Sequence, residues 1–183
     1  MLVAEKNTGI SVGRGNGDVH VRVAGRGTFQ NGQPLRQYAV EMIGQGARQF
    51  IVDLGQCEGM DSTFLGVLAG IGLQLREPPT QGQLRLANVS PRNLELLQTL
   101  GLDRLFEIGP VLSPEPAGLV LQQLPDPAVS QFPAAPTKDD AADLLLTAHE
   151  NLIRADQRNQ TKFKDLTTVL RARAAQRTSE KSS

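Results

Sequence analysis

The sequence predicts an α/β fold, in which a mixed β-sheet with packed helices is followed by a C-terminal helical extension. Three observations lead to this fold class. Two strand-like segments open the chain, helical and strand-like segments then alternate, and a proline-rich stretch precedes a long segment without Gly or Pro. Alternating strands and helices are typical of one sheet with helices against its faces.

The N-terminal segment is expected to form a β-hairpin. Strands are expected from Ile10 to Val12 and from Asp18 to Ala24. In the second strand, valines alternate with polar residues at the two-residue period of a half-buried strand. The glycine-rich residues Gly13 to Gly17 are expected to form the turn.

Three helices and two strands are expected after the hairpin. The helices carry apolar residues three and four positions apart, whereas the strands are short apolar or alternating runs. The expected elements are a helix from Pro34 to about Gln45, a strand from Phe50 to Leu54, a helix starting at Asp61, a strand from Leu84 to Val89, a helix from Ser90 to Gly101, and a possible last strand from Gly118 to Gln122.

The helix that starts at Asp61 has an apolar face and two glycines. Its residues Leu65, Leu68 and Ile71 are expected to face the sheet. Gly66 and Gly70 lie one turn apart, which permits close packing either inside the domain or against a partner.

The chain divides into four parts. Residues 1–124 are predicted to form the globular domain, and residues 125–138, with four prolines at positions 125 to 136, a linker. Residues 139–177 are predicted to form one long amphipathic helix, with Leu145, Leu152, Asn159 and Leu166 repeating every seven residues. This helix lies on its own domain or in solvent, or else self-associates or binds a partner. Residues 178–183 are expected to be disordered.

Composition excludes several classes of function. Lys plus Arg and Asp plus Glu both number 19, so no basic field favours nucleic acid as a partner. Cys57, His20 and His149 are too few for a structural metal site, and no motif indicates a cofactor. The longest apolar runs are too short for membrane insertion. We therefore expect a cytoplasmic protein, with Cys57 a small buried side chain and His149 on a solvated helix face.

The trio Asp61-Ser62-Thr63 stands directly before an apolar helical run. Such residues act as N-caps, because their side-chain oxygens accept from backbone N–H groups of the first turn. The same place also tolerates an added phosphate, since free N–H groups and the helix dipole favour negative charge. Catalysis by Ser62 is not expected, because a Gly-x-Ser-x-Gly elbow is missing and neither histidine lies near it in sequence.

Two motifs in this order resemble the STAS family, which includes the anti-sigma-factor antagonists. The first is the strand from Phe50 to Leu54 followed by Asp61-Ser62-Thr63-x-Leu65-Gly66, and the second is Asn88-Val89-Ser90-Pro91 leading to Gly101-Leu102-Asp103. The resemblance covers residues from about Gly9 to Leu124 and implies a STAS-like sheet with packed helices.

The resemblance also implies a non-enzymatic switch. In that family the serine after the Asp is phosphorylated by a partner anti-sigma factor that is a serine kinase, and a phosphatase reverses the step. The residue that matches is Ser62, with Thr63 as the alternative acceptor. The implied partner-binding residues are Asp61, Ser62, Thr63, Phe64 and Gly66, and Phe64 replaces the usual Gly. The alternative is an adaptor or scaffold subunit of a stress-signalling assembly or a transporter, without phosphorylation.

Overall fold

A computed structural model describes residues 8–110, 118–125 and 137–180 of the chain. Its elements follow the expected alternation of strands and helices, with two further helices at the end. In chain order they are β1 (Gly9–Gly15), β2 (Asp18–Gly27), α1 (Phe29–Gly44), β3 (Gln49–Met60), α2 (Ser62–Arg76), β4 (Gln83–Ala87), α3 (Pro91–Thr99), the 3-10 turn η1 (Leu102–Arg104), β5 (Glu107–Gly109), β6 (Gln122–Gln123), α4 (Lys138–Ala155) and α5 (Asn159–Glu180).

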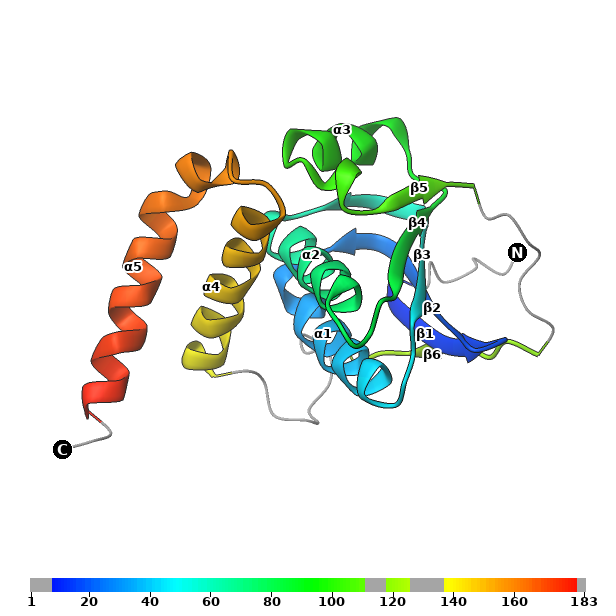
Figure 1. The fold of residues 1–183 in the computed structure, drawn as a ribbon, viewed down its shortest axis with the longest axis horizontal. Helices are drawn as coiled ribbons and strands as arrows, with labels where there is room; N and C mark the ends of the chain where they lie inside the picture. The colour runs from blue at the N-terminus through cyan, green and yellow to red at the C-terminus, as the bar shows by residue number, and fades with distance from the viewer. Residues whose placement is uncertain (1–7, 111–117, 126–136, 181–183) are drawn as a thin grey trace, which may run out of the picture.

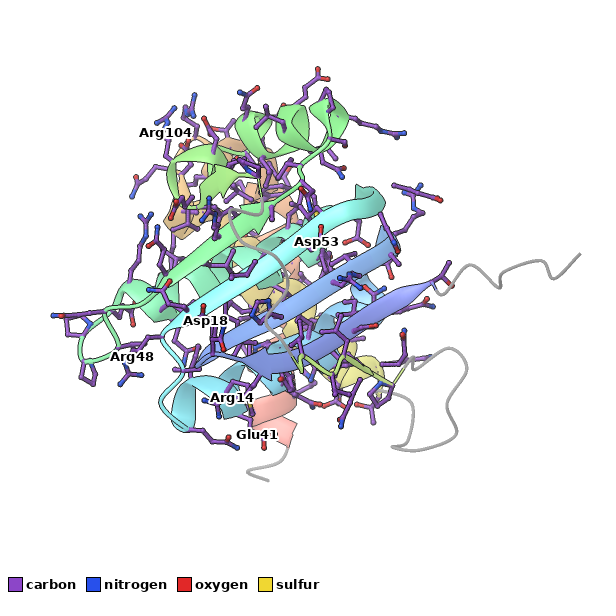
Figure 2. All side chains as sticks on the ribbon, turned by 90° about the vertical axis from the view of Figure 1, so that its right-hand side faces the viewer. Arg14, Asp18, Glu41, Arg48, Asp53 and Arg104 are labelled. Atoms are coloured by element: carbon purple, nitrogen blue, oxygen red, sulfur yellow. The ribbon has the colours of Figure 1, made fainter. Side chains whose placement is uncertain are left out.

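The six strands form one mixed sheet in the order β5-β4-β3-β2-β1-β6. The pairs of β1 with β2 and with β6 are antiparallel, whereas β2, β3, β4 and β5 run parallel to one another. Helices α1 and α2 lie side by side on one face of the sheet, with α4 outside them and α5 further out (Figure 1). The opposite face of the strands carries side chains such as Asp53, and no helix of the described residues covers it (Figure 2). The predicted α/β class with a mixed sheet is therefore confirmed.

Several predicted element boundaries differ from the observed ones, at the hairpin turn, at the start of α1 and at the last two strands. The hairpin turn is only Asn16-Gly17, and both residues have positive φ, as a tight two-residue turn requires. Helix α1 begins before Pro34, because Thr28 caps it and Asn31 accepts from the Thr28 amide at 2.8 Å. Strand β5 was not expected, and the last strand is the two-residue β6 rather than Gly118 to Gln122.

The core lies between the sheet and the helices and is built from aliphatic side chains and three Phe rings. As expected, Leu65, Leu68 and Ile71 of α2 are buried. Helix α2 is buried on nearly all of its faces, because the sheet lies on one side and α4 on the other. Two residues of α4, Leu144 and Leu152, belong to the same buried cluster as the strands.

The single long helix predicted for residues 139–177 was wrong, because the structure contains two helices, α4 and α5. The chain leaves helical geometry at Asp156, whose φ of −149° and ψ of 117° are extended. The Asp156 carboxylate then accepts from the Arg158 backbone amide at 2.9 Å and from its guanidinium. This local pairing offers the backbone an alternative to helical hydrogen bonds.

The turn between α4 and α5 is fixed to the domain by Asn159. This side chain is 1% exposed, and its amide donates to the carbonyls of Leu100 at 2.9 Å and Leu152 at 2.8 Å. Next to it, Gly101 leaves room for Asp156, because a Cβ on Gly101 would come within 2.8 Å of the Asp156 Cβ. The two helices therefore form a hairpin, called the C-terminal hairpin below (residues 138–180).

The remaining boundaries concern the linker and the tail. Most of the predicted linker, residues 126–136, lies outside the described residues, and α4 starts at Lys138, one residue before the expected helix. Helix α5 continues to Glu180, so residues 178–180 are helical rather than disordered, and residues 181–183 lie outside the described part. Among the described helices, none combines the length and the apolar character needed to cross a membrane.

Candidate functional site

Asp61 joins the starts of two helices. It lies between β3 and α2 in an extended conformation, with φ of −85° and ψ of 168°. One carboxylate oxygen accepts from the Phe64 amide at 2.8 Å, and the other accepts from the Phe29 amide, also at 2.8 Å. Asp61 is thus the N-cap of α2 and also satisfies a first-turn amide of α1. Both oxygens are engaged inside the domain.

Ser62, the first residue of α2, contacts the C-terminal hairpin. Its Oγ lies 3.1 Å from Nε2 of His149 in α4, and Nδ1 of that ring lies 2.7 Å from the Leu145 carbonyl oxygen. A carbonyl only accepts, so Nδ1 carries a proton, and in the neutral ring Nε2 accepts the Ser62 hydroxyl hydrogen. The His149 side chain is 2% exposed, and its ring meets Phe163 of α5 edge to face at 4.7 Å.

The expectation that His149 lies on a solvated helix face was wrong. The histidine lies on the buried side of α4, directly after Ala148 and three residues before Leu152, which are both buried. Sequence reasoning missed its role because it is 87 residues from Ser62 along the chain. The periodicity of α4 was an available signal, since His149 follows Leu145 by one turn on the apolar stripe.

The Ser62 and His149 pair differs from a hydrolase dyad in its surroundings. The atom that a carboxylate orients in a triad, Nδ1, donates here to the Leu145 carbonyl. The two carboxylates next to the pair in sequence have other partners: Asp61 accepts from two backbone amides, and Glu150 pairs with Arg171 at 2.9 Å. The pair therefore holds α4 to the start of α2, and a backbone carbonyl stands where a triad has the carboxylate that stabilises the imidazolium.

Two of the expected partner-binding residues lie inside the domain. The expected exposure of Phe64 was wrong, since this side chain is 0% exposed and a Cβ on Gly27 would come within 2.5 Å of its ring. Thr63, the alternative acceptor, is 4% exposed. Phe64 belongs to the buried core cluster, and Thr63 is buried beside it in the first turn of α2. Ser62 is half-buried and is thus the more accessible hydroxyl of the two.

The glycines of α2 allow α4 to approach closely. A Cβ on Gly66 would lie 2.8 Å from Cα of Ala148, and closer still to its carbonyl group. One turn further on, a Cβ on Gly70 would lie 3.1 Å from Cγ of Asn151, whose amide donates to the Gly66 carbonyl at 3.3 Å. The close approach that the glycine spacing indicated is therefore made with α4.

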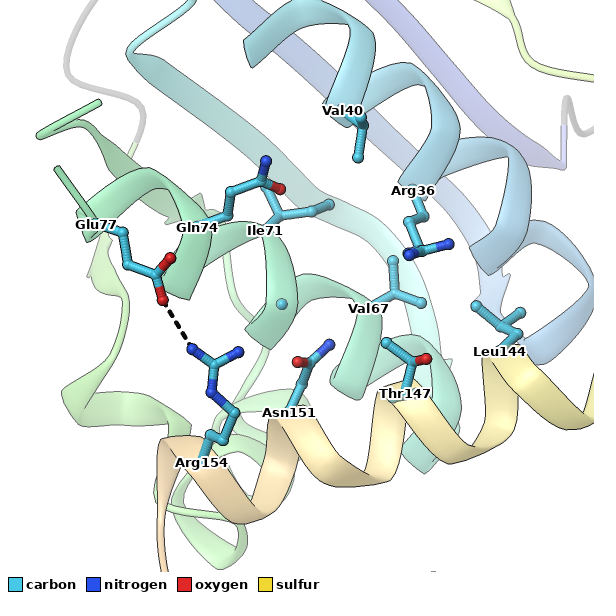
Figure 3. A pocket seen from close by; sticks show the side chains of 12 residues that line it. Arg36, Val40, Val67, Ile71, Gln74, Glu77, Leu144, Thr147, Asn151 and Arg154 are labelled. Atoms are coloured by element: carbon cyan, nitrogen blue, oxygen red, sulfur yellow. Dashed lines mark hydrogen bonds and ion pairs between the residues drawn. The ribbon is translucent and has the colours of Figure 1, made fainter. Parts of the chain in front are cut away.

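A cavity of about 310 Å³ lies beside this contact, between α1, α2 and α4 (Figure 3). Its lining combines Arg36 and Val40 of α1 with Gly70 of α2 and Thr147 of α4. At one end, Arg154 pairs with Glu77 at 2.7 Å. Ser62 does not line this cavity. The space shows that α4 does not fill the groove between α1 and α2.

The second motif of the family resemblance, Asn88-Val89-Ser90-Pro91, forms the loop after β4 and the start of α3, and it does not contribute to the Ser62 site. Ser90 caps α3 by accepting from the Asn93 amide at 3.2 Å, and Asn93 donates to the Cys57 carbonyl at 3.0 Å. Cys57 is buried as expected, and burial raises the pKa of its thiol. In the described residues, no three His, Cys, Asp or Glu side chains gather at a spacing suited to a metal ion.

Comparison with known proteins identifies the fold family. The family model described as Mlab, STAS domain, matches residues 10–111, more than half of the chain. The chain belongs to the STAS domain family. The STAS match ends before α4 and α5, so His149 and the rest of the C-terminal hairpin lie outside the matched region.

Relatives of this STAS domain include anti-sigma factor antagonists. The anti-sigma-B factor antagonist of Bacillus subtilis (strain 168) is 30% identical over 102 residues, which are 56% of this chain and 91% of the relative. An anti-sigma factor antagonist from Mycobacterium paratuberculosis has 22% identity and a TM-score of 0.49, over 61% of this chain and 92% of its own. The Bacillus cell fate determinant SpoIIAA in its phosphorylated form has 22% identity and a TM-score of 0.47, over 56% and 92%.

Proposed function

We propose that this protein is a cytoplasmic anti-sigma-factor antagonist whose binding to a partner anti-sigma factor, a serine kinase, is switched off by phosphorylation of Ser62. The observation that carries the proposal is the position of Ser62. It is the first residue of α2 in a STAS domain whose curated relative is an anti-sigma-B factor antagonist. A phosphatase would return the protein to its binding state. The protein itself would act by binding and not by catalysis.

A phosphate on Ser62 changes binding more than folding. It adds about 1.5 to 2 negative charges at neutral pH, together with strong acceptor oxygens. The positive end of α2 and its first-turn amides favour that charge, so the domain stays folded. A partner surface that fits a neutral hydroxyl would instead have to desolvate the charge without pairing it, which costs several kcal/mol, an effect on the order of 100-fold or more in affinity.

Burial favours Ser62 over Thr63 as the acceptor. A kinase must bring the γ-phosphate of ATP to the hydroxyl, and Thr63 is only 4% exposed. Ser62 is half-buried, and its hydroxyl contacts His149 of α4. Among the other expected contact residues, Asp61 supports the geometry of Ser62, and Gly66 becomes a contact residue only when α4 is absent.

The test is the phosphorylation state of the full chain purified from its native cell. We expect intact mass to show one phosphate that phosphatase removes, and tandem mass spectrometry to place it on Ser62. A Ser62→Ala variant should lose the phosphate, whereas Thr63→Val should keep it. A chain without phosphate at Ser62 under all growth and stress conditions would favour the adaptor or scaffold function instead.

The Ser62 and His149 pair also allows a test of nucleophilic catalysis by Ser62. A fluorophosphonate probe reacts with serines that a neighbouring base activates. We expect no labelling of Ser62 on the full chain, because Nδ1 of His149 donates to a carbonyl and not to a carboxylate. Stoichiometric labelling that disappears in His149→Phe would show an activated nucleophile and contradict a purely binding role.

A further inference from the structure

We propose that α4 is an intramolecular competitor of the partner kinase, which covers Ser62 and the adjoining face of α2 and must leave before the kinase can bind. The inference rests on the proposed function and adds a regulator to it. Three observations carry it: the contact that α4 makes with Ser62, the close packing of α4 over Gly66, and the origin of α4 outside the STAS domain.

The contact with Ser62 involves the hydroxyl that would receive the phosphate. In the docked state, the Ser62 hydroxyl donates to Nε2 of His149 at 3.1 Å. His149 is itself fixed, because Nδ1 donates to Leu145 and the ring packs on Phe163. A phosphorus atom with three further oxygens cannot enter between atoms that are already at hydrogen-bond distance. The Ser62 hydroxyl must therefore turn away from His149, or α4 must move, before it can be modified.

The helix also occupies the surface beside Ser62. Ala148 lies directly over Gly66, one turn beyond Ser62, at a distance that leaves no room for a Cβ. A partner that reads Ser62 together with Gly66 would need the same space. Docked α4 and such a partner cannot occupy this surface at the same time. Helix α4 therefore competes with the partner for the surface at Ser62 and Gly66.

The docking of α4 has the features of a contact that can open. Polar side chains take part in it, including His149, Asn151 and the exposed pair of Arg154 with Glu77. The cavity of about 310 Å³ lies along the same interface, so packing is incomplete there. By contrast, Leu65 and Leu68 of α2 are buried in one apolar cluster with the strands. Interfaces with these features open at lower free energy than a domain core.

Competition of this kind reduces the apparent affinity by the open fraction. If α4 were undocked in about 1% of molecules, the partner would bind about 100-fold more weakly than it binds the open form. Phosphoryl transfer would be limited in the same way. In that step the Ser62 Oγ forms a bond to the γ-phosphorus of ATP, ADP leaves with the bridging oxygen, and the hydroxyl proton passes to a base of the kinase.

The test uses the full chain and a matched pair of variants. Ala148→Arg places a long charged side chain between α4 and α2, where Ala148 is 1% exposed. Ala172→Arg makes the same change at an exposed position of α5. Both are combined with Cys57→Ala and Ser62→Cys, and the reaction of the introduced thiol with a water-soluble disulfide reagent is followed. We expect Ala148→Arg to raise the reaction rate by about tenfold or more, in proportion to the open population, and Ala172→Arg to leave it unchanged.

The second readout follows the same two variants, with Ser62 retained, in the native cell. We expect phosphate occupancy at Ser62 to be higher in Ala148→Arg than in the wild type and in Ala172→Arg. In the thiol reaction, a Gly66→Ala variant, which pushes against α4 from the α2 side, should behave like Ala148→Arg. It keeps the test valid if Ala148→Arg fails to fold.

The outcomes separate the inference from the proposed function. The reference for the thiol reaction is the chain with Cys57→Ala and Ser62→Cys alone. Equal reaction rates in this reference and in both arginine variants would show that α4 does not cover Ser62. A raised rate with unchanged phosphate occupancy would show that α4 covers the site without limiting the kinase, and would overturn the competition. Absence of phosphate from Ser62 in every variant would contradict the proposed function itself, while the thiol reaction would still decide whether α4 covers the site.

Discussion

Phe64 stands at the position where the family resemblance implies a glycine. Its ring fits into the core because two neighbouring positions, Gly27 and Gly32, have no side chain. Gly27, at the end of β2, leaves the space that the ring fills, and Gly32 in α1 lies against its other edge. The large residue and the two glycines therefore form one packing unit. A residue that interrupts a motif in the sequence is here part of the core between β2, α1 and α2.

This packing predicts a large loss of stability for Phe64→Ala. We expect the free energy of unfolding to fall by about 3 to 5 kcal/mol, the range for removing a buried Phe ring. Val40→Ala, at a position 48% exposed, is the control and should change it by about 0.5 kcal/mol or less. Chemical denaturation of the full chain measures both. A change below 1 kcal/mol for Phe64→Ala would return the ring to the partner surface.

The Asp156 carboxylate predicts a pH effect at the turn of the C-terminal hairpin. Hydrogen bonds from the Arg158 side chain and backbone lower the pKa of Asp156 from 3.8 to about 2. The folded state thus prefers the charged form, so this contribution to stability is complete above pH 3.8 and is lost as the pH falls through about 2. Carboxyl NMR shifts should titrate near 2 in the wild type and closer to 3.8 in Arg158→Ala. A midpoint near 3.8 in the wild type would show that Arg158 does not hold the carboxylate.

Among the elements, α2 differs from α1 and α3 in having almost no polar face. Its residues from Phe64 to Leu73 are all apolar or glycine. A helix that is apolar all round is buried on all sides, and this pattern indicates a cover in addition to the sheet. The sequence therefore contained a sign that another element lies on α2. It did not identify α4 as that element, because the apolar stripe of α4 suits self-association equally well.

The two glycines of α2 should respond differently to the same substitution. Gly66→Ala brings a Cβ against the backbone of Ala148, which cannot yield without moving α4. Gly70→Ala meets only the end of the flexible Asn151 side chain. We expect hydrogen exchange of the α4 amides to accelerate about tenfold or more in Gly66→Ala and by less than about twofold in Gly70→Ala. Equal exchange in the two variants would mean that the close contact at Gly66 does not position α4.

The break between α4 and α5 shows where pattern reasoning ends. The segment contains no Gly or Pro, and its seven-residue repeat continues across the break through Asn159. Besides the local pairing of Asp156 with Arg158, two contacts with the domain fix the break: Asp156 fits against Gly101, and the Asn159 amide donates to the Leu100 carbonyl. These contacts are made with residues about 55 to 60 positions earlier, so no local pattern could reveal them.

At the scale of the molecule, the hairpin, the alternation and the STAS motifs were enough to predict the mixed sheet and the start of α2. These features are local, since Asp61, Ser90 and the valines of β2 act through neighbours in sequence. The meeting of Ser62 with His149 depends instead on how the C-terminal hairpin packs. This contact could not be derived from the sequence, because the STAS motifs end before α4. The C-terminal hairpin also follows a segment whose sequence has no apolar periodicity.

A chain that ends after Leu124 tests how far the STAS domain depends on its cover. We expect it to fold, because β6 still pairs with β1 and the sheet side of α2 is complete. Loss of Leu144 and Leu152 should lower its midpoint in urea and expose an apolar face that binds a hydrophobic dye. The full-length chain is the reference for both measurements. Unfolding without cooperativity would show that the C-terminal hairpin is part of the folding unit.

The double engagement of Asp61 bears on how the Asp-Ser-Thr motif is read in other chains. Its two oxygens close the first turns of both α1 and α2, so replacing it costs two caps, about 1 kcal/mol or more for each. Selection for folding alone would keep this aspartate even in a descendant without the proposed kinase partner. Under the proposed function, the Asp therefore marks the STAS architecture, whereas a hydroxyl at the next position would mark the signalling. Lineages that vary at position 62 while keeping Asp61 would be the natural place to look for STAS proteins converted to permanent binding.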